Sequence, residues 1–288
     1  MLSDQQSGSG KPPDINDNLV KKPAEIDGMR RAGGFNGRLL DFIRPYVQAG
    51  TTTGRLDDLV RQYTLDHGHT PACLGYHGFP KSCCISINNV VCHGIPSGHE
   101  YLRDGDIVNV DLTTIVDGYY GDSSETFMLG EVAPQARDLV EVTACALLRG
   151  VAAVKPGRPL YAVADAIEPW VRSRGCSVVH QYTGHGIGRM FHEHFTVYHH
   201  RDSDEQPILM KPGMTFTIEP MINRGDWKVV TDKKDKWTVR TADGSLSAQF
   251  EHTVLVTESG VEVLTLTPSQ KQAGAILMVP GMELNSDV

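Results

Sequence analysis

The chain has 288 residues, 40% of them hydrophobic, which is enough to bury one large domain or two fused halves. Its formal net charge of −8 argues against a general nucleic-acid-binding protein, because such proteins usually carry a basic surface, and we expect no DNA partner. No run of about 18 apolar residues is present, so we expect no membrane span.

The first part of the chain, residues 1–20, is polar and lacks the apolar run of a signal peptide. Its aspartates and its lack of arginine also argue against a mitochondrial transit sequence. We expect a flexible tail, with a docking segment as the alternative. The six cysteines include no CxxC pair, which argues against a zinc ribbon or a thioredoxin-like motif, so we expect reduced thiols in a cytoplasmic protein.

Two helical segments resemble each other at a constant distance along the chain. Residues 47–68 and 154–175 each begin with a glycine-containing turn and continue as an amphipathic helix that stops at a glycine. They align without a gap, so that Gly50 matches Gly157. A further helix is predicted upstream of each segment, at about 24–48 and 134–154.

A strand is predicted downstream in each half, at 104–116 and at 212–222, and Asp111 and Glu219 occupy equivalent positions. The near-constant offset across a helix and a later strand favours an internal duplication over chance similarity. Two halves related by a pseudo-twofold axis would point these acids toward each other, and such an interface is a usual place for a ligand site.

We therefore predict an α/β (α+β) protein built from two similar halves. Its single domain would span residues 21–266, with halves at about 24–130 and 134–266. Residues 267–288 would form a C-terminal tail, for which the sequence indicates no function.

Asp111 lies in an apolar, β-branched run that is typical of a buried strand. A carboxylate there is unfavourable unless it has a partner, which could be a metal ion or a nearby arginine or lysine. Asp117-Gly118 is a strong signal for a two-residue hairpin turn. This turn would place Asp122 diagonally across from Asp111 on one face of the hairpin, about 7–8 Å away between Cα atoms. A bound cation is more plausible than two solvated acids at that distance.

Glu219 precedes Pro220, which favours an extended backbone and a position on a strand. Glu251 begins a run that ends as a core strand at Val254–Val256. Either glutamate alone could face water on an edge strand. With Asp111 and Asp122, however, four acids lie on predicted core strands, where charged residues are rare. Two divalent ions would neutralise their charge. An oxygen-rich site suits Mn, Fe(II), Co or Zn. Such paired ions are suited to the hydrolysis of an amide or ester.

The segment Tyr182–His200, YTGHGIGRMFHEHFTVYHH, contains five histidines, which raises the question of which of them hold a metal. His192-Glu193-His194 lacks the HExxH spacing that places two ligands on one helical face, so the remaining ligands must lie elsewhere in the chain.

Six motifs in this order resemble those of the bacterial type I methionine aminopeptidases, over about residues 20–266. They are CLGYHGFP, SINNVVCHGIP, NVDLTTIVDGYYGDSSETF, GHGIGRMFHE, TIEPM and SAQFEHT. The resemblance implies the pita-bread fold, in which two pseudosymmetric halves surround a central antiparallel sheet with helices on its outer face.

The resemblance also implies the metal ligands and the catalytic residues. The ligands to two divalent ions would be Asp111, Asp122, His185, Glu219 and Glu251. Metal-bound hydroxide would attack the carbonyl that follows an N-terminal methionine, with Glu219 as a candidate general base. His192 would bind the scissile carbonyl or its oxyanion, and His93 would be the second histidine that contacts the substrate.

The remaining histidines receive no role in catalysis. We expect His194, His199 and His200 to lie in a solvated loop. His252, beside Glu251, is expected to point to the opposite face of its strand.

By resemblance, the methionine pocket combines aromatic rings and soft sulfur atoms, which suit a thioether side chain. Its residues would be Cys73, Tyr76, Phe79, Cys84, Phe191 and Trp237. Phe79 replaces a tyrosine that is often found there, which leaves a hydrogen bond from that hydroxyl in doubt. A monovalent cation, Na or K, is predicted at the backbone carbonyls of Asn88, Val90 and Ser247.

The implied substrates are nascent polypeptides with a small second residue, and a monomer that works near the ribosome is expected. Two alternatives are open. An Xaa-Pro peptidase would share the fold and the five ligands but usually carries an additional N-terminal domain. A non-catalytic binding protein of this fold would be expected to lose ligands, and none is missing here.

Overall fold

The computed structural model describes residues 19–201 and 208–279. Its α-helices are α1 (Pro23–Ile43), α2 (Thr53–Asp66), α3 (Pro134–Ala153), α4 (Ala162–Ser173) and α5 (Pro268–Ala273). Its strands are β1 (Thr70–Pro71), β2 (Cys84–Ile87), β3 (Val90–Cys92), β4 (Ile107–Val116), β5 (Tyr119–Met128), β6 (Ser177–Val178), β7 (Gly184–Gly186), β8 (Glu193–Val197), β9 (Thr215–Ile218), β10 (Met221–Asn223), β11 (Val229–Thr231), β12 (Val239–Thr241), β13 (Ser247–Gln249), β14 (Glu251–Val256) and β15 (Val261–Val263).

A nine-stranded antiparallel sheet forms the centre of the molecule. Its strand order is β1-β4-β5-β14-β9-β7-β8, with β2 beside β4 and β15 beside β14. Two three-stranded sheets, β13-β10-β6 and β11-β12-β3, adjoin it. The pairing of β5 with β14 joins the first half of the chain to the second.

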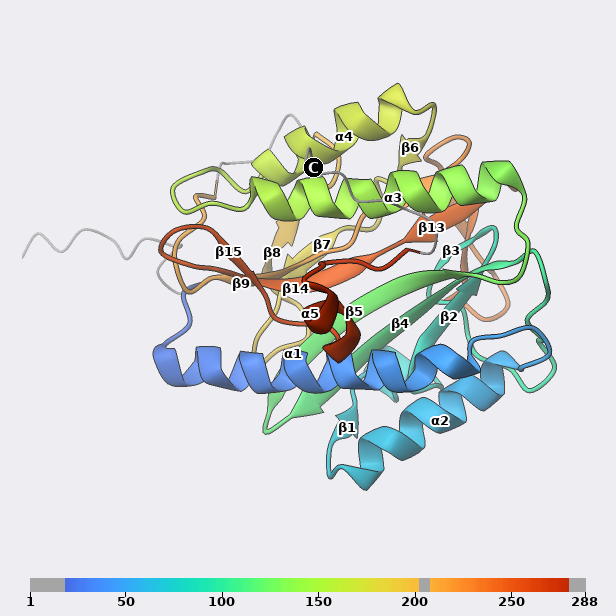
Figure 1. The fold of residues 1–288 in the computed structure, drawn as a ribbon, viewed down its shortest axis with the longest axis horizontal. Coiled ribbons are helices and arrows are strands. Elements are labelled where there is room, and N and C mark those ends of the chain that lie inside the picture. Colours follow the sequence, from blue (N-terminus) through green and yellow to red (C-terminus); the bar gives the residue numbers. More distant parts are fainter. Residues whose placement is uncertain (1–18, 202–207, 280–288) are drawn as a thin grey trace, which may run out of the picture.

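Two pairs of helices cover the two halves. Helix α1 lies against β4 and β5, whereas α3 lies against β9, β10 and β13. Figure 1 shows α1 and α2 along one side of the strands and α3 and α4 along the other. Each pair covers its own apolar core: Leu39, Leu40 and Leu56 belong to the first, and Leu147 and Ile167 belong to the second. This arrangement confirms the predicted α/β fold of two halves around an antiparallel sheet.

Helix α1 fits closely against residues 264–266 because two of the helix residues that face them are glycines. A Cβ atom on Gly33 would lie 2.6 Å from the Leu264 carbonyl oxygen, and one on Gly37 would lie 2.6 Å from the Leu266 oxygen. At Gly34, in contrast, a Cβ atom would face open space, and its nearest neighbour would be the Arg38 Nη1 atom, 3.8 Å away. The glycines at 33 and 37 therefore permit a close backbone approach.

Glycines at matching positions of the two halves have the same unusual backbone conformation. The φ angles are +88° and +82° at Gly50 and Gly157, and +74° and +68° at Gly68 and Gly175. Residues 105 and 213, both glycine, form a third pair at +89° and +92°. Residues other than glycine rarely adopt such φ angles. The chain therefore turns in the same way before and after each amphipathic helix. This agreement supports the predicted internal repeat.

The β4–β5 hairpin has the predicted turn and register. Asp117 and Gly118 both have positive φ, +51° and +78°, as a two-residue hairpin of this kind requires. Thr113 lies opposite Asp122, and Asp111 lies opposite Ser124. Asp111 and Asp122 therefore share one face of the hairpin, as the sequence predicts.

The strand predicted at 212–222 is interrupted, which corrects one expectation. Strand β9 ends at Ile218 and β10 begins at Met221, so Glu219 and Pro220 lie between them instead of on a continuous strand. Strand β9 belongs to the central sheet and β10 to a smaller one. The chain changes sheets here because Pro220 has no N–H with which to continue the first ladder.

The C-terminal part of the described chain returns to the core. Thr267 accepts a hydrogen bond from the Gln270 N–H and so starts α5. Beyond this helix, Leu277 and Val279 join the apolar core beneath α3. The predicted flexible tail at 1–20 lies outside the described residues except for its last two positions, and 280–288 also lie outside them.

The six cysteines are free thiols, as predicted. Within 19–201 and 208–279, no helix has both the length and the apolar character needed to cross a membrane.

Candidate metal centre and substrate pocket

One cavity brings most of the predicted site residues together. It has a volume of about 210 Å³ and is lined by residues from both halves of the chain. All five predicted metal ligands line it: Asp111, Asp122, His185, Glu219 and Glu251. The predicted histidines and pocket residues line it too: His93, His192, Cys73, Tyr76, Phe79, Cys84, Phe191 and Trp237.

Strand register explains how three of the acids converge. Asp111 on β4 and Glu251 on β14 both lie opposite Ser124 of the intervening β5, so they stand in one row across the sheet. Asp122 lies two residues before Ser124 and therefore faces the same side. The central pairing thus places acids from both halves on one face.

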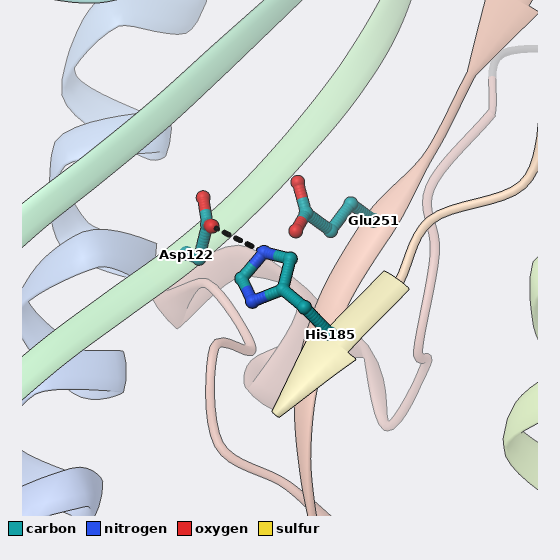
Figure 2. A group of neighbouring side chains, drawn as sticks. All are labelled: Asp122, His185 and Glu251. Carbon is teal, nitrogen blue, oxygen red and sulfur yellow. Dashed lines mark ion pairs between the residues drawn. The ribbon is translucent and has the colours of Figure 1, made fainter. Parts of the chain in front are cut away.

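Three side chains form a compact group of possible metal ligands. Asp122, His185 and Glu251 offer donor atoms that all lie within 4.8 Å of one another. Figure 2 shows them pointing toward a common point from β5, β7 and β14. The His185 Nε2 atom lies 3.7 Å from Asp122 Oδ2 and 3.6 Å from Glu219 Oε1. Asp111 lines the same cavity outside this compact group.

The orientation of His185 suits a metal ligand. Its Nδ1 lies 3.0 Å from the Gly186 carbonyl oxygen, and only a protonated nitrogen can donate there. The Nε2 atom consequently faces the carboxylates. This second contact is the usual way in which a protein fixes the tautomer and the ring orientation of a ligating histidine.

The carboxylates repel one another in this buried site. Burial, together with the charge of Asp122, raises the pKa of Asp111 well above its usual range. Burial and the charges of Asp122 and Glu219 also raise the pKa of Glu251. Burial raises the pKa of Glu219 to about 7, against the opposing effect of His185. Such a cluster of acids is what a bound cation would stabilise.

His185 has the opposite electrostatic balance. Burial alone would lower its pKa, but the nearby carboxylates of Asp122 and Glu219 raise it overall. The acids therefore favour the protonated form of the imidazole, which a metal ion on Nε2 would replace.

Hydrogen bonds hold the acids in place. The Thr113 hydroxyl donates to Asp122 Oδ1 at 2.8 Å. The Thr217 hydroxyl donates to Glu219 Oε1 at 2.7 Å, and the Gln249 amide donates to Glu219 Oε2 at 3.3 Å. Each of these donors leaves lone pairs of the carboxylate free for a metal ion.

The two predicted substrate histidines are neutral at ordinary pH. His192 lies 2.8 Å from the Tyr76 hydroxyl through Nδ1, and desolvation, aided by the charge of His185, lowers its pKa to about 4. Burial lowers the pKa of His93 to about 4. The backbone of His93 is unusual for a side chain with a Cβ atom, with φ of +57°, and its ring meets Tyr182 edge-on. Neutral imidazoles can donate hydrogen bonds to a carbonyl oxygen without adding charge.

The predicted methionine pocket forms a small apolar cluster of its own. Cys73, Phe79 and Cys84 are buried together, with Phe191 and Trp237 packed against them. Phe79 meets Trp237 edge-on at 5.1 Å between ring centroids. Without a hydroxyl, the ring of Phe79 fills this space by apolar contact alone.

The residues predicted to bind a monovalent cation are only partly brought together. The Asn88 carbonyl accepts a hydrogen bond from the Ser247 N–H at 2.8 Å, which places these two backbones in contact. Val90 lies on β3, two residues beyond Asn88. The cation itself stays a prediction.

The expectation that His199 and His200 lie in a solvated loop is wrong. Their side chains are buried, and His199 is only 1% exposed. The Glu219 N–H donates to His199 Nε2 at 3.1 Å. His194 is exposed as predicted, although it lies on β8. The error arises because three histidines beyond the glycine-rich loop look polar, whereas the segment after β8 brings His199 against the buried backbone at Glu219.

Sequence reasoning did not assign seven further residues that line the cavity. They are His77, Cys92, Thr113, Tyr182, Thr183, Met221 and Gln249. Several lie within or beside the quoted motifs, so proximity to those motifs was the available signal. His252, as predicted, points away from the cavity, because its ring contacts Thr265 and Ile276.

Comparison with known proteins agrees with this geometry. The pattern of metallopeptidase family M24 matches residues 27–258, which is most of the chain. The chain belongs to metallopeptidase family M24. A metallopeptidase requires divalent metal ions, and the group formed by Asp122, His185 and Glu251 could hold one.

Relatives within the family are similar over nearly their whole length. Methionine aminopeptidase from Salmonella typhimurium is 50% identical over 248 residues, covering 86% of this chain and 93% of that protein. Methionine aminopeptidase A from Synechocystis is 50% identical over 242 residues, covering 84% and 95%. The solved structure of methionine aminopeptidase from Rickettsia prowazekii matches with a TM-score of 0.82 at 45% identity, covering 86% of this chain and 99% of that one.

A more distant structure shares the fold. The Xaa-Pro dipeptidase from Bacillus anthracis matches with a TM-score of 0.70 at 21% identity. The match covers 87% of this chain but 62% of that longer chain.

Proposed function

We propose that this protein is a methionine aminopeptidase, which removes the N-terminal methionine from polypeptides whose second residue is small. The observation that carries the proposal is one cavity in which a cluster of acids and His185 adjoins an apolar pocket of aromatic rings and thiols. The acids and His185 suit hydrolysis of an amide, and the apolar pocket suits a thioether side chain. Relatives of this name at 50% identity support the same conclusion.

Two divalent ions would be held by Asp111, Asp122, His185, Glu219 and Glu251. The residues fit such ions, because four acids converge in a buried cavity and a single imidazole, that of His185, has its pKa raised toward a compensating charge. Oxygen ligands with one imidazole suit Mn, Fe(II), Co or Zn. When bound, these ions supply the Lewis acidity that activates water and polarises a carbonyl group. A monovalent cation at Asn88, Val90 and Ser247 is a further part of the proposal.

The side chains around the metal site would orient the substrate and move its protons. The pocket formed by Cys73, Phe79 and Trp237 would hold the methionine side chain. His192 and His93 would donate hydrogen bonds to the scissile carbonyl oxygen as negative charge develops on it. Glu219, with a pKa raised to about 7, would accept a proton from the attacking water and return one to the leaving amine.

The substrates would be the N-termini of nascent chains, met near the ribosome by a cytoplasmic monomer. The chain that we describe offers no membrane-spanning helix, and its net charge of −8 leaves ribosomal contact to local basic groups. These expectations on partners follow from the proposed substrate.

The proposal can be tested with the peptide Met-Ala-Ser and chelator-stripped protein, titrated separately with Mn(II), Co(II), Fe(II) and Zn(II). We expect free methionine only after metal addition, and its loss in Asp111→Ala. Asp58→Ala is the control, because Asp58 is an exposed acid on α2. If no metal restored cleavage in folded protein, a non-catalytic binding protein would become the better description.

The same assay separates the remaining alternative. An Xaa-Pro peptidase would cleave Xaa-Pro peptides in preference to Met-Ala peptides. The shared fold with the Bacillus anthracis Xaa-Pro dipeptidase makes this comparison necessary. The apolar, thiol-containing pocket favours methionine.

A further inference from the structure

The backbone at Glu219 has an unusual environment. Strand β9 ends one residue earlier at Ile218, and β10 begins two residues later in a different sheet. The N–H of Glu219 therefore has no place in a strand ladder, and Pro220 has no N–H at all. A buried N–H without an acceptor would be unfavourable, so the fold must supply one from elsewhere.

His199 supplies this acceptor. Its Nε2 atom lies 3.1 Å from the Glu219 nitrogen, and its side chain is 1% exposed. It reaches Glu219 from the end of the segment that follows β8, twenty residues earlier in the chain. The contact is made to the backbone, so the carboxylate of Glu219 stays directed into the cavity.

Glu219 is thereby held at three points. His199 fixes the backbone N–H, Thr217 fixes Oε1 and Gln249 fixes Oε2. The two contacts to the carboxylate can follow a moving side chain, since Thr217 and Gln249 carry rotatable groups. The contact to the backbone sets the direction in which the side chain leaves the main chain.

We propose that His199 is a positioning residue, which fixes the Glu219 carboxylate for metal binding and proton transfer by accepting the Glu219 N–H. The proposal rests on the proposed function for the role of Glu219, although the contact itself does not. His199 would not touch the substrate.

The two ring nitrogens of His199 differ in their hydrogen bonds. Because Nε2 accepts a hydrogen bond, the ring proton is on Nδ1. The Nδ1 atom is buried and has no hydrogen-bond partner among the described residues. Only the acceptor function is used, so glutamine, whose side-chain oxygen reaches about as far as Nε2, can replace it. Methionine has a similar length but is a weak acceptor.

The test compares His199→Gln with His199→Met, and His194→Met is the control, because His194 is exposed on β8. Each protein is loaded with Co(II), whose visible absorption reports the geometry of its ligands, and metal affinity is measured by titration. Turnover of Met-Ala-Ser then gives kcat and KM separately.

We expect His199→Met to weaken metal binding or lower kcat by about 10-fold to 100-fold, the usual loss when a group supporting a metal ligand is removed. Its Co(II) spectrum should change, and KM should stay within about twofold, because the methionine pocket is intact. His199→Gln should recover most of the loss. His194→Met should match the natural protein in every readout.

An unchanged Co(II) spectrum and kcat in His199→Met would overturn the proposal, as would equal losses in the Gln and Met variants. If His199→Met does not fold, the spectrum and kcat of His199→Gln decide alone, and a tenfold loss there would count against the acceptor role. If the natural protein binds Co(II) but does not cleave the peptide, the proposed function fails, while the spectral comparison still tests His199.

Discussion

His252 and Glu251 are neighbours on β14 whose side chains serve different parts of the molecule. Glu251 faces the cavity, whereas the His252 ring lies between the Thr265 hydroxyl and the Ile276 carbonyl oxygen. The Nε2 atom must donate to that carbonyl, so Nδ1 accepts from Thr265 and the ring is neutral. Burial lowers the pKa of His252 to about 4.

This low pKa of His252 makes the stability of the folded protein sensitive to acid. In the unfolded chain the imidazole takes up a proton below its ordinary pKa of about 6.5, whereas the folded protein resists protonation until about pH 4. Stability that is present above about pH 6.5 is therefore lost as the pH falls through this window, by up to about 3 kcal/mol. His252→Gln keeps a donor for Ile276 but cannot titrate.

We expect the difference in unfolding free energy between the natural protein and His252→Gln to shrink or reverse in favour of the variant between pH 7 and pH 4. Urea denaturation at each pH measures it, and other titrating groups cancel because they are common to both proteins. A difference that does not change with pH would contradict this role of His252.

Individual residues differ in how well the sequence predicts their position. The opposite facing of Glu251 and His252 follows from the alternation of a strand, and it is confirmed. The burial of His199 and His200 is not predictable from the sequence, because it depends on where the segment after β8 lies relative to distant residues such as Glu219. The position of Glu219 beyond the end of its strand is not predictable either, since nothing local reveals that the chain changes sheets at Pro220.

At the level of elements, the sequence predicts the pairing of strands that are adjacent in the chain well, and the pairing of strands that are distant in the chain poorly. The turn at Asp117-Gly118 sets the register of the whole β4–β5 hairpin, so the shared face of Asp111 and Asp122 follows from a few residues. The pairing of β5 with β14 has no such signal. It joins segments about half the chain apart, so the sequence groups Glu251 with the two aspartates only as an acid on a core strand, without showing which strand it pairs with.

Helix α1 provides a direct test of element packing, because Gly37 is closely packed whereas Gly34 has open space beside it. Gly37→Ala should be destabilising by about 1–3 kcal/mol, as its methyl group would approach the Leu266 carbonyl to 2.6 Å and push the helix away. Gly34→Ala is the matched control, since the space there is open. It should raise stability by about 0.5–1 kcal/mol, the usual gain for alanine over glycine inside a helix.

Urea unfolding of both variants measures these effects. Equal changes in the unfolding free energy of Gly37→Ala and Gly34→Ala would mean that the stability of α1 does not depend on its close approach to residues 264–266. Because α1 lies against β4 and β5, a displaced helix should also weaken metal binding by the aspartates on that hairpin.

At the scale of the whole molecule, the proposed metal site joins the two halves. Asp111 and Asp122 come from the first half, and His185, Glu219 and Glu251 come from the second. Without metal, their mutual repulsion works against the closed arrangement. Because the acids have raised pKa values in the folded state, the folded protein holds protons that the unfolded chain has released, and stability falls as the pH rises from about 4.5 through about 7.

We therefore expect Glu251→Gln to be more stable than the natural protein when both are chelated at pH 8, because glutamine removes one of the mutually repelling buried carboxylates. Adding Mn(II) should reverse the order, because the natural protein gains more from binding. Glu258→Gln, an exposed site, should follow the natural protein throughout. A chelated Glu251→Gln that is less stable would show that packing of Glu251 outweighs its charge.

The division of the ligands between the halves has a consequence for how the protein is made. Thr253 on β14 donates to the Asp122 carbonyl, a contact between residues 131 positions apart. During synthesis, the β4–β5 hairpin and its two aspartates emerge long before β14 can pair with them. If the ions bind as proposed, all five ligands can come together only after the last strands of the second half have been synthesised. For an enzyme proposed to act on other nascent chains, its own activity would thus begin only after its synthesis is nearly complete.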